Sequence, residues 1–356
     1  MKTIMHITEV SSGGVLPIIV GQCNGIAEKY KVVFVYGTRF DTPRNISELF
    51  NKNVELIHLD SFQRKINLKS DLKTMKALSE IVQKYNPDVV HMHSSKAGFV
   101  GRFGLLRYKG IKLYTPHGYS FLKPDNNLIK KIIYFVAEKI LAATGSVTVA
   151  CGKEEYLVAK KVGRKTICLE NALDTKLIDE ILDSGSANDS ADFSVYTVGR
   201  IGPQKNPQMF NELAKRFENI SFYWIGDGDD RYILSSPNIT VTGVLNRADV
   251  IRLSQKLKCY VSCSPSEGLP IALLEAMYLK KICVVTNVSG NNELIDDSTG
   301  YLYDNLEQCT ETIRKIIDDR TDALEKSINA RQRVIQKYDM SRLNKEYIEI
   351  LETIGE

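Results

Sequence analysis

The sequence predicts an α/β protein made of two doubly wound, Rossmann-like domains, each with a mostly parallel sheet covered by helices on both faces. The chain has 356 residues, which is more than one hydrophobic core usually organises. Short β-branched segments alternate with longer amphipathic ones, as is typical of parallel sheets. The alternation stops at a polar stretch rich in Gly, Ser and Asp (183–192), which indicates a surface connection, and then starts again.

The first domain is predicted to span residues 1–172. Its longer segments carry apolar residues at helical spacing, and its shorter ones are nearly continuous apolar runs. The predicted strands are 2–8, 31–37, 53–59, 88–93, 111–118, 146–151 and 166–171, and the predicted helices are 16–29, 71–85 and 129–145.

The second domain, residues 173–338, repeats this pattern. Its helix at 206–217 begins near Pro207, and proline is favoured in a first turn because its missing N–H would have no partner there. The last predicted helix, 341–354, has no obvious place in the second domain, so we expect residues 339–356 to return to the first. The predicted strands are 193–199, 220–226, 238–243, 259–264 and 282–287.

Composition indicates a protein of the cytoplasm. Hydrophobic residues make up 43% of the chain and charged residues 25%, which is ordinary for a globular protein. No apolar run approaches the ~20 residues that a spanning helix needs, and the amino terminus does not resemble a signal peptide. The seven cysteines include no C-x-x-C pair, so we expect neither a disulfide framework nor a zinc site.

Charge is distributed unevenly along the chain. Residues 1–190 carry 27 Lys and Arg against 19 Asp and Glu, whereas residues 191–356 carry 20 against 24. The segments 102–110 and 129–145 also mix cations and aromatics with aliphatic residues. This pattern favours peripheral contact with an anionic membrane, which we expect at the inner face of the plasma membrane. The alternative is an ordinary lysine-rich surface exposed to solvent.

Polar and glycine-rich segments follow several of the predicted strands. They are EVSSGGV (9–15), HSSKAG (93–98), HG (117–118), GRIGPQKN (199–206) and PSEGLP (265–270). Ligands of open parallel sheets bind outside the carboxyl ends of the strands. Because both predicted sheets carry polar and glycine-rich segments at the carboxyl ends of their strands, we expect a binding cleft between two facing domains.

The segment GRIGPQKNP (199–207) is a candidate diphosphate site. Gly199 and Gly202 permit a tight turn after a strand, and Arg200 and Lys205 precede the start of a helix. Cations beside a helix N-terminus suit a diphosphate. The alternative is a solvated loop between a strand and a helix.

The segment EGLPIALLEA (267–276) places a carboxylate at each end of an apolar run. Pro270 predicts a helix start, which puts Glu267 in the preceding loop and Glu275 within the helix. A carboxylate only accepts hydrogen bonds, so it suits the vicinal hydroxyls of a sugar or a ribose. The alternatives are a helix cap for Glu267 and an exposed helix face for Glu275, which has no cationic neighbour in sequence before Lys280.

Together these segments resemble the family 4 retaining glycosyltransferases with the GT-B fold. The resemblance covers nearly the whole chain: GGV, HSSKAG, TPHG, the IGDGD loop (225–229) and the E-x7-E segment occur in the family's order. HSSKAG and TPHG resemble the bacterial members that assemble capsule, O-antigen or exopolysaccharide. One departure is Glu170-Asn171-Ala172, where many relatives have Pro-Asn-Gly.

The resemblance implies a role for each matching residue. Catalytic roles fall to His117, Glu267, Arg200 and Lys205. The donor nucleotide-sugar, with UDP favoured, is bound by Gly13, Gly14, Arg200, Lys205, Glu267, Gly268, Leu269 and Glu275, with Glu275 on the ribose. The acceptor side is assigned to His93, Ser94 and Lys96. For these three the alternative is a helix N-cap with a solvated lysine, and for His117 it is a hydrogen bond to backbone.

The predicted reaction is metal-independent transfer of a hexosyl or N-acetylhexosaminyl group, with retention, to a lipid-linked glycan. Relatives expel the diphosphate by front-face attack, and no cofactor and no nucleic-acid partner is expected. The D-x-D of residues 227–229 binds metal in another glycosyltransferase fold, but here it matches a glycine-rich loop. Alternatives are a sugar-nucleotide epimerase of the same fold and a non-catalytic nucleotide-sugar-binding subunit. A dinucleotide dehydrogenase is disfavoured, because no G-x-G-x-x-G follows a strand.

Overall fold

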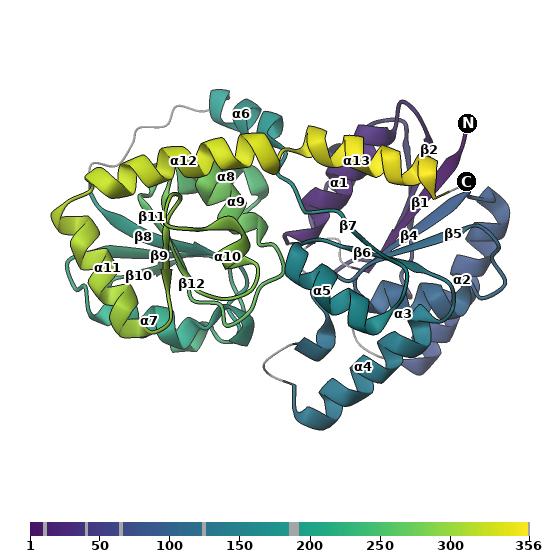
Figure 1. The fold of residues 1–356 in the computed structure, drawn as a ribbon, viewed down its shortest axis with the longest axis horizontal. Helices are drawn as coiled ribbons and strands as arrows, with labels where there is room; N and C mark the ends of the chain where they lie inside the picture. Colours follow the sequence, from purple (N-terminus) through teal and green to yellow (C-terminus); the bar gives the residue numbers. More distant parts are fainter. Residues whose placement is uncertain (10–12, 40–41, 64–66, 123–125, 185–191, 355–356) are drawn as a thin grey trace. The chain divides into compact units, whose positions relative to one another are not determined.

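The chain folds into two compact α/β units (Figure 1), described here from a computed structural model. The described residues are all except 10–12, 40–41, 64–66, 123–125, 185–191 and 355–356, so most of the predicted connection at 183–192 lies outside them. One unit consists of residues 1–171 and 340–356, and the other of residues 172–339. The chain therefore leaves the first unit once and re-enters it near its end.

The first unit is built on a seven-stranded parallel sheet. The strand order is β3-β2-β1-β4-β5-β6-β7, and β1 pairs with both β2 and β4. Every residue of β1 and β4 is buried, as expected of strands covered on both faces. The strands are β1 (Thr3–Thr8), β2 (Lys31–Tyr36), β3 (Val54–His58), β4 (Val89–His93), β5 (Ile111–Thr115), β6 (Val147–Ala150) and β7 (Thr166–Cys168).

Helices follow most strands of this sheet and cover it. They are α1 (Val15–Ile26), α2 (Leu68–Tyr85), α3 (Ser95–Gly104), α4 (Leu128–Ala142) and α5 (Lys153–Val162), with 3-10 turns η1 (Ile46–Leu49) and η2 (Ser120–Leu122). A buried ion pair ties α3 to α4: Nη2 of Arg102, which is fully buried, lies 2.7 Å from Oε2 of Glu138. A second bond from the Tyr114 hydroxyl, 2.8 Å from Oε1, holds the same carboxylate.

The last helix, α13 (Met340–Thr353), belongs to the first unit and packs along α1, which confirms the predicted return of the chain. Two glycines of α1 make this close approach possible. A Cβ on Gly21 would lie 2.4 Å from the Met340 side chain, and one on Gly25 would lie 1.9 Å from that of Asn344. Tyr347 of α13 is fully buried against the sheet.

The second unit repeats the arrangement with a six-stranded parallel sheet in the order β10-β9-β8-β11-β12-β13. Its strands are β8 (Ser194–Val198), β9 (Ser221–Ile225), β10 (Ile239–Val241), β11 (Cys259–Ser262), β12 (Ile282–Thr286) and β13 (Tyr301–Tyr303). Its helices are α6 (Thr175–Asp183), α7 (Pro207–Lys215), α8 (Arg247–Lys256), α9 (Ile271–Tyr278), α10 (Asn291–Leu294), α11 (Leu306–Asp318) and α12 (Thr321–Lys337), with η3 (Pro203–Lys205) and η4 (Arg231–Ile233).

Both sheets reverse their strand order at one point. In the first unit the reversal lies between β1 and β4, and in the second between β8 and β11. Ligands of doubly wound sheets bind at the carboxyl ends of the strands beside such a reversal. The segments that follow these four strands therefore lie where a ligand is expected to bind.

Candidate functional site

In the second unit, Lys205 and Glu267 meet beside the strand-order reversal. Lys205 ends the η3 turn after β8, and Glu267 lies in the loop after β11. Lys205 Nζ is 2.6 Å from Glu267 Oε1, and the two side chains are only 18% and 7% exposed. Two residues predicted to act on the same donor are thus brought together as a largely buried ion pair.

The loops that carry this pair are packed backbone against backbone by glycines. Gly226 has φ +143°, and a Cβ there would lie 2.2 Å from the carbonyl oxygen of Gly199. Gly290 has φ +83°, and its Cβ would lie 2.2 Å from the carbonyl oxygen of Gly268. Side chains at Gly226 or Gly290 would push these loops apart, so the glycines fix the positions of both loops.

Arg200 lies in the same loop as Lys205 but is more exposed. Its Nη2 is 2.7 Å from Asp229 Oδ2, with 43% and 88% of the two side chains exposed. Asp227 accepts a bond of 2.8 Å from the Gly228 amide and lies 3.4 Å from Arg231. The aspartates of the D-x-D segment are thus engaged by cations and an amide of their own loop.

Glu275 lies on α9 and is 8% exposed, so the alternative of an exposed helix face is wrong. Its carboxylate Oε1 is 2.9 Å from Nη1 of Arg247 at the start of α8. Burial raises the pKa of Glu275, and the nearby guanidinium opposes that shift. Nε and Nη2 of Arg247 are buried without a hydrogen-bond partner among the described residues. The cation that was missing from the neighbouring sequence is therefore supplied by another helix.

The loop that contains Glu267 leads directly into α9, which carries Glu275. Pro270 is the N-cap of this helix and contributes no side-chain cap. Leu269 is 4% exposed, so its side chain anchors the loop. The predicted donor contacts of Gly268 and Leu269 would come from their backbone amides beside the positive end of the helix.

In the first unit, Ser94 begins α3 at the carboxyl end of β4. Its φ is +86°, and its hydroxyl oxygen accepts a bond of 3.3 Å from the Ala97 amide, which confirms the N-cap interpretation. Ser94 Oγ also donates to the buried carboxylate of Glu9, which Arg39 approaches at 3.3 Å. Burial raises the pKa of Glu9.

Lys96 is held in place rather than solvated. Its Nζ lies 2.5 Å from Oδ1 of Asp71 on α2, and the two side chains are 10% and 6% exposed. The solvated-lysine alternative is therefore wrong. Gly13, with φ +60°, and Gly14, the N-cap of α1, lie exposed in the loop after β1.

His117 follows β5 in a constrained loop. Its φ is +51° and that of Gly118 is +93°, so two consecutive residues are left-handed. Glu155 holds the loop through bonds from the amides of Gly118 (2.7 Å) and Cys151 (2.8 Å). The His117 ring does not use a backbone partner among the described residues: its Nε2 lies 3.2 Å from Nδ1 of His93. Burial lowers the pKa of His117 to about 4, so its imidazole is neutral at pH 7.

Four residues that support these sites were not predicted. They are Glu9, Arg39, Glu155 and Arg247. Glu9 could have been found, because a carboxylate directly after a buried strand lies at the binding edge of a parallel sheet. Nothing in the local sequence marks the other three.

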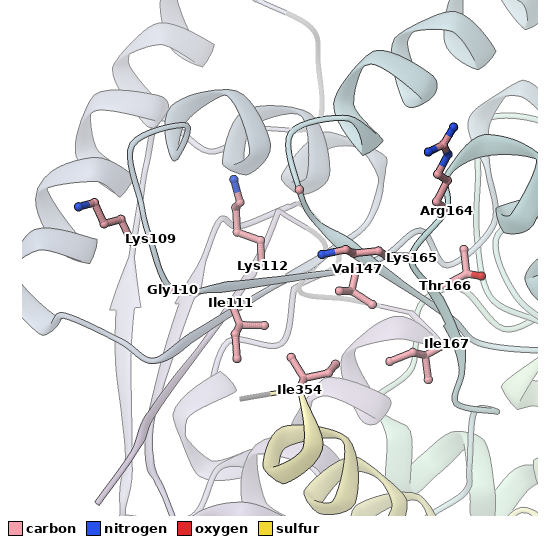
Figure 2. A pocket seen from close by; sticks show the side chains of 11 residues that line it. Lys109, Gly110, Ile111, Lys112, Val147, Arg164, Lys165, Thr166, Ile167 and Ile354 are labelled. Carbon is pink, nitrogen blue, oxygen red and sulfur yellow. The ribbon is translucent and has the colours of Figure 1, made fainter. Parts of the chain in front are cut away.

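A separate cavity of about 520 Å³ lies at the opposite edge of the first sheet, where β5, β6 and β7 begin (Figure 2). Lys109, Lys112, Arg164 and Lys165 line it, together with Ile354 near the end of α13. Lys112 Nζ donates to the Thr144 carbonyl at 2.8 Å. None of the predicted site residues lines this cavity, so it is not part of the candidate site.

Comparison with known proteins agrees with the fold. Residues 12–177 match the family model "Glycosyltransferase Family 4", and residues 179–336 match "Glycosyl transferases group 1". Two parallel-sheet units of this kind define the GT-B class of glycosyltransferases. The chain belongs to the family 4 glycosyltransferases.

Relatives act in bacterial surface polysaccharide synthesis. The chain is 25% identical over 324 residues to UDP-Gal:alpha-D-GlcNAc-diphosphoundecaprenol alpha-1,3-galactosyltransferase of Escherichia coli, covering 83% of each protein. It is 24% identical to the capsular polysaccharide biosynthesis glycosyltransferase CapM of Staphylococcus aureus, covering 95% of this chain and 93% of CapM.

Among solved structures, the sucrose-phosphate synthase of Thermosynechococcus elongatus matches with a TM-score of 0.85. The match covers 99% of both chains at 16% sequence identity. At this identity the likeness establishes the GT-B fold and nothing about substrates. Among the described residues, no helix is both long enough and apolar enough to cross a membrane.

Proposed function

We propose that this glycosyltransferase moves a sugar from a UDP-sugar to a lipid-linked glycan, with retention of anomeric configuration and without a metal. The Lys205–Glu267 ion pair carries the proposal, because it sets a cation for a diphosphate beside an acceptor for sugar hydroxyls. The named donor and acceptor of the Escherichia coli relative, UDP-Gal and a diphosphoundecaprenol-linked sugar, support the substrate classes.

The chemical difficulty is the departure of the diphosphate as positive charge develops on the sugar. Lys205 and Arg200 would stabilise the leaving diphosphate, and preorganised charge of this kind typically contributes most to such a step. Glu267 would accept bonds from hydroxyls of the transferred sugar, and Glu275 from the ribose. His117 would contact the transferred sugar, and His93, Ser94 and Lys96 would lie on the acceptor side.

A donor-hydrolysis assay tests this function directly. We expect the protein to release UDP slowly from one of UDP-glucose, UDP-galactose, UDP-GlcNAc and UDP-GalNAc, and to do so equally well in EDTA. Proton NMR of the first-formed sugar should show the α-anomer from these α-linked donors, because retention preserves the configuration. Activity that vanished in EDTA and returned with Mn²⁺ would contradict metal independence.

Two competing functions give different results in the same assay. An epimerase would convert one UDP-sugar into its epimer without releasing UDP. A non-catalytic subunit would bind UDP and turn over none of the four donors. Either result would contradict the proposed sugar transfer and favour the corresponding competing function.

A lipid-linked acceptor requires the enzyme to work at a membrane surface, and α4 offers a face for this. Six aliphatic side chains along this helix are 47% to 72% exposed, although burying them would be favourable. Lys130, Lys131 and Lys139 accompany them on the same helix. The six are Leu128, Ile129, Ile132, Ile133, Val136 and Ile140; we call them the α4 face.

The α4 face continues onto neighbouring elements of the first unit. Phe99 and Phe103 of α3 are 37% and 39% exposed, and Leu106, which follows α3, is 58% exposed. α3 contacts α4. We propose that this surface inserts among the headgroups of an anionic membrane while its lysines meet the phosphates.

We expect the protein to float with vesicles of phosphatidylglycerol and phosphatidylethanolamine, and to be released by high salt. The double variant Ile129→Glu, Ile133→Glu should lose at least about tenfold in bound fraction, because two carboxylates would replace inserted aliphatics. Leu324→Glu, Ile328→Glu on α12 is the matched control: both pairs are four residues apart and exposed. Equal losses in the two variants, or no salt-sensitive flotation, would contradict the membrane proposal.

A further inference from the structure

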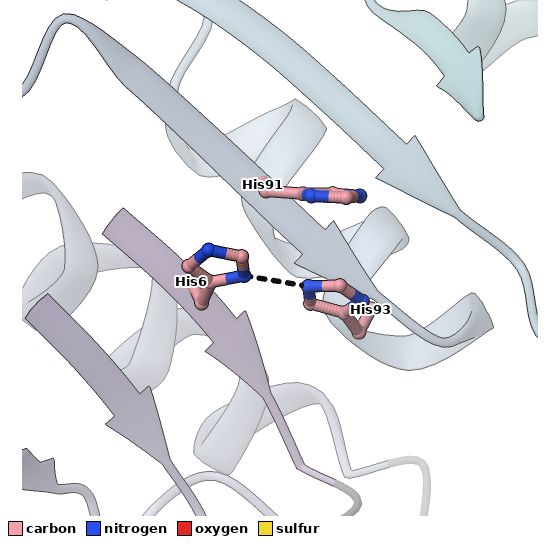
Figure 3. Close-up of side chains that lie close together, drawn as sticks. All are labelled: His6, His91 and His93. Atoms are coloured by element: carbon pink, nitrogen blue, oxygen red, sulfur yellow. Dashed lines mark hydrogen bonds between the residues drawn. The ribbon is translucent and has the colours of Figure 1, made fainter. Parts of the chain in front are cut away.

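Four of the five histidines form one group along the first sheet. His6 lies on β1 and His91 and His93 on β4, on neighbouring strands whose register pairs His6 with His91. His117 follows β5, the next strand in the sheet. His6 and His91 are fully buried and His93 is 1% exposed. Figure 3 shows these three side chains and the hydrogen bond between His6 and His93. The proposed reaction uses only His117 and His93, which leaves His6 and His91 without a function.

Three of the imidazoles are linked in a line. His6 Nδ1 lies 2.9 Å from His93 Nε2, and His93 Nδ1 lies 3.2 Å from His117 Nε2. The rings of neighbouring members are near parallel, at 10° for the first pair and 22° for the second. His93 is therefore the central residue, with one nitrogen facing each neighbour.

His91 is anchored separately. Its Nδ1 lies 2.9 Å from the Tyr347 hydroxyl of α13, and its Nε2 lies 2.8 Å from Thr115 Oγ1. Nitrogens of His6, His91 and His93 come within 4.8 Å of one another, a spacing that a metal could bridge. Hydrogen bonds, however, already engage every one of these nitrogens except Nε2 of His6. We therefore interpret the group as a hydrogen-bonded network.

The three linked rings are neutral at pH 7. Burial lowers the pKa of His6 to about 3 and that of His117 to about 4. Burial, reinforced by the neighbouring imidazoles, holds the pKa of His93 well below its usual range. Each neutral imidazole carries one N–H donor and one acceptor nitrogen. Two hydrogen bonds in line therefore permit only two proton arrangements.

The unpaired Nε2 of His6 distinguishes these arrangements. In one arrangement His117 donates to His93 and His93 donates to His6, so the proton of His6 sits on Nε2 as a buried N–H with no acceptor among the described residues. In the other arrangement His6 donates to His93 and His93 donates to His117, so Nε2 of His6 carries only an unused lone pair. A buried N–H without a partner is the rarer and costlier defect. The second arrangement is therefore favoured: His93 donates to Nε2 of His117, and His117 carries its proton on Nδ1.

We propose that His93 is a positioning residue that fixes His117 in the Nδ1–H tautomer, with His6 setting the tautomer of His93 from behind. His117 then offers an N–H donor, and the partner that suits it is a hydroxyl oxygen on the transferred sugar of the donor. This last step rests on the proposed function of His117, whereas the tautomer does not.

Two variants of His93 separate its two bonds. In His93→Asn the side-chain amide stands close to where Nδ1 stood, so it can still donate to His117 but no longer reaches His6. In His93→Gln the amide stands near the former Nε2, so it keeps the contact with His6 and loses the donor to His117. Each variant removes one buried imidazole, so each is the control for the other's loss of packing.

Two-bond ¹H–¹⁵N spectra of the free protein, labelled at histidine, report the tautomer. We expect His117 as Nδ1–H in the wild type and in His93→Asn. In His93→Gln it should move toward the Nε2–H form that an isolated imidazole prefers. Nε2–H in the wild type, or the same tautomer in all three proteins, would overturn the proposal whatever the enzyme does.

Turnover of the UDP-sugar identified above separates the positioning role from the function of His117. We expect His93→Gln to have a kcat at least about tenfold below that of His93→Asn, with little difference in KM. If the tautomer of His117 changes as expected in His93→Gln but kcat stays normal, the proposed contact of His117 with the sugar is wrong. The proposal that His93 fixes the tautomer of His117 is then still supported.

Discussion

Replacing Lys205 with methionine is expected to lower kcat for sugar transfer at least about a hundredfold. The ammonium lies 2.6 Å from Glu267 in a largely buried pair, and preorganised charges on a leaving group are typically worth about 10²–10³ in rate. Its loss also leaves the Glu267 carboxylate, 7% exposed, to repel the diphosphate that it should help to position. Steady-state release of UDP measures the effect.

Lys215→Met is the matched control for this variant. Lys215 also pairs with a glutamate, Glu212 at 2.9 Å, but both side chains are well exposed, so we expect wild-type turnover. Lys205→Arg should recover part of the rate because it restores the charge without the compact geometry. A Lys205→Met enzyme that is folded and within threefold of wild type would place the diphosphate elsewhere.

Replacing Glu275 with glutamine is expected to weaken UDP binding about ten- to a hundredfold. A bond from a ribose hydroxyl to a carboxylate is worth ~1.5–3 kcal/mol, and glutamine lacks the charge that strengthens it. Calorimetric titration should show that wild type prefers UDP to 2′-deoxy-UDP, which lacks one of the two hydroxyls. The variant should lose most of this preference.

The ion pair with Arg247 gives this experiment a second possible outcome. Glu275 Oε1 and Arg247 Nη1 lie 2.9 Å apart, and the side chains of the two residues are 10% and 25% exposed. Glutamine will therefore also cost stability by leaving the guanidinium poorly compensated. A variant that melts earlier but keeps the wild-type ratio of UDP to 2′-deoxy-UDP affinity would show that Glu275 serves Arg247 and not the ribose.

The periodicity of the sequence predicted most of the architecture. Both parallel sheets and the start of α7 at Pro207 follow from patterns within single segments. The return of α13 is expected because its helical segment has no place in the second domain. α2 begins at Leu68, three residues before the prediction, because Asn67 caps it through the Ser70 amide. β13, with three residues, is too short to carry a period.

Pairings between distant segments could not be predicted in the same way. Glu275 meets Arg247 because α8 and α9 flank β11, and the distance in sequence conceals this. His6 and His93 meet because β1 pairs with β4 across 87 residues. Carboxyl ends of strands could be recognised from the sequence, but the partner that each side chain finds there depends on sheet register.

The return of α13 to the first unit has a consequence for synthesis of the chain. The first unit lacks the helix that covers α1 until residues 340–353 have been made, and the 168 residues of the second unit come between (172–339). At ~5–20 residues per second, that interval lasts roughly ten to thirty seconds. During it the glycine-lined face of α1 and the binding place of Tyr347 beside His91 stay open. The nascent first unit therefore keeps this face uncovered until α13 has been synthesised.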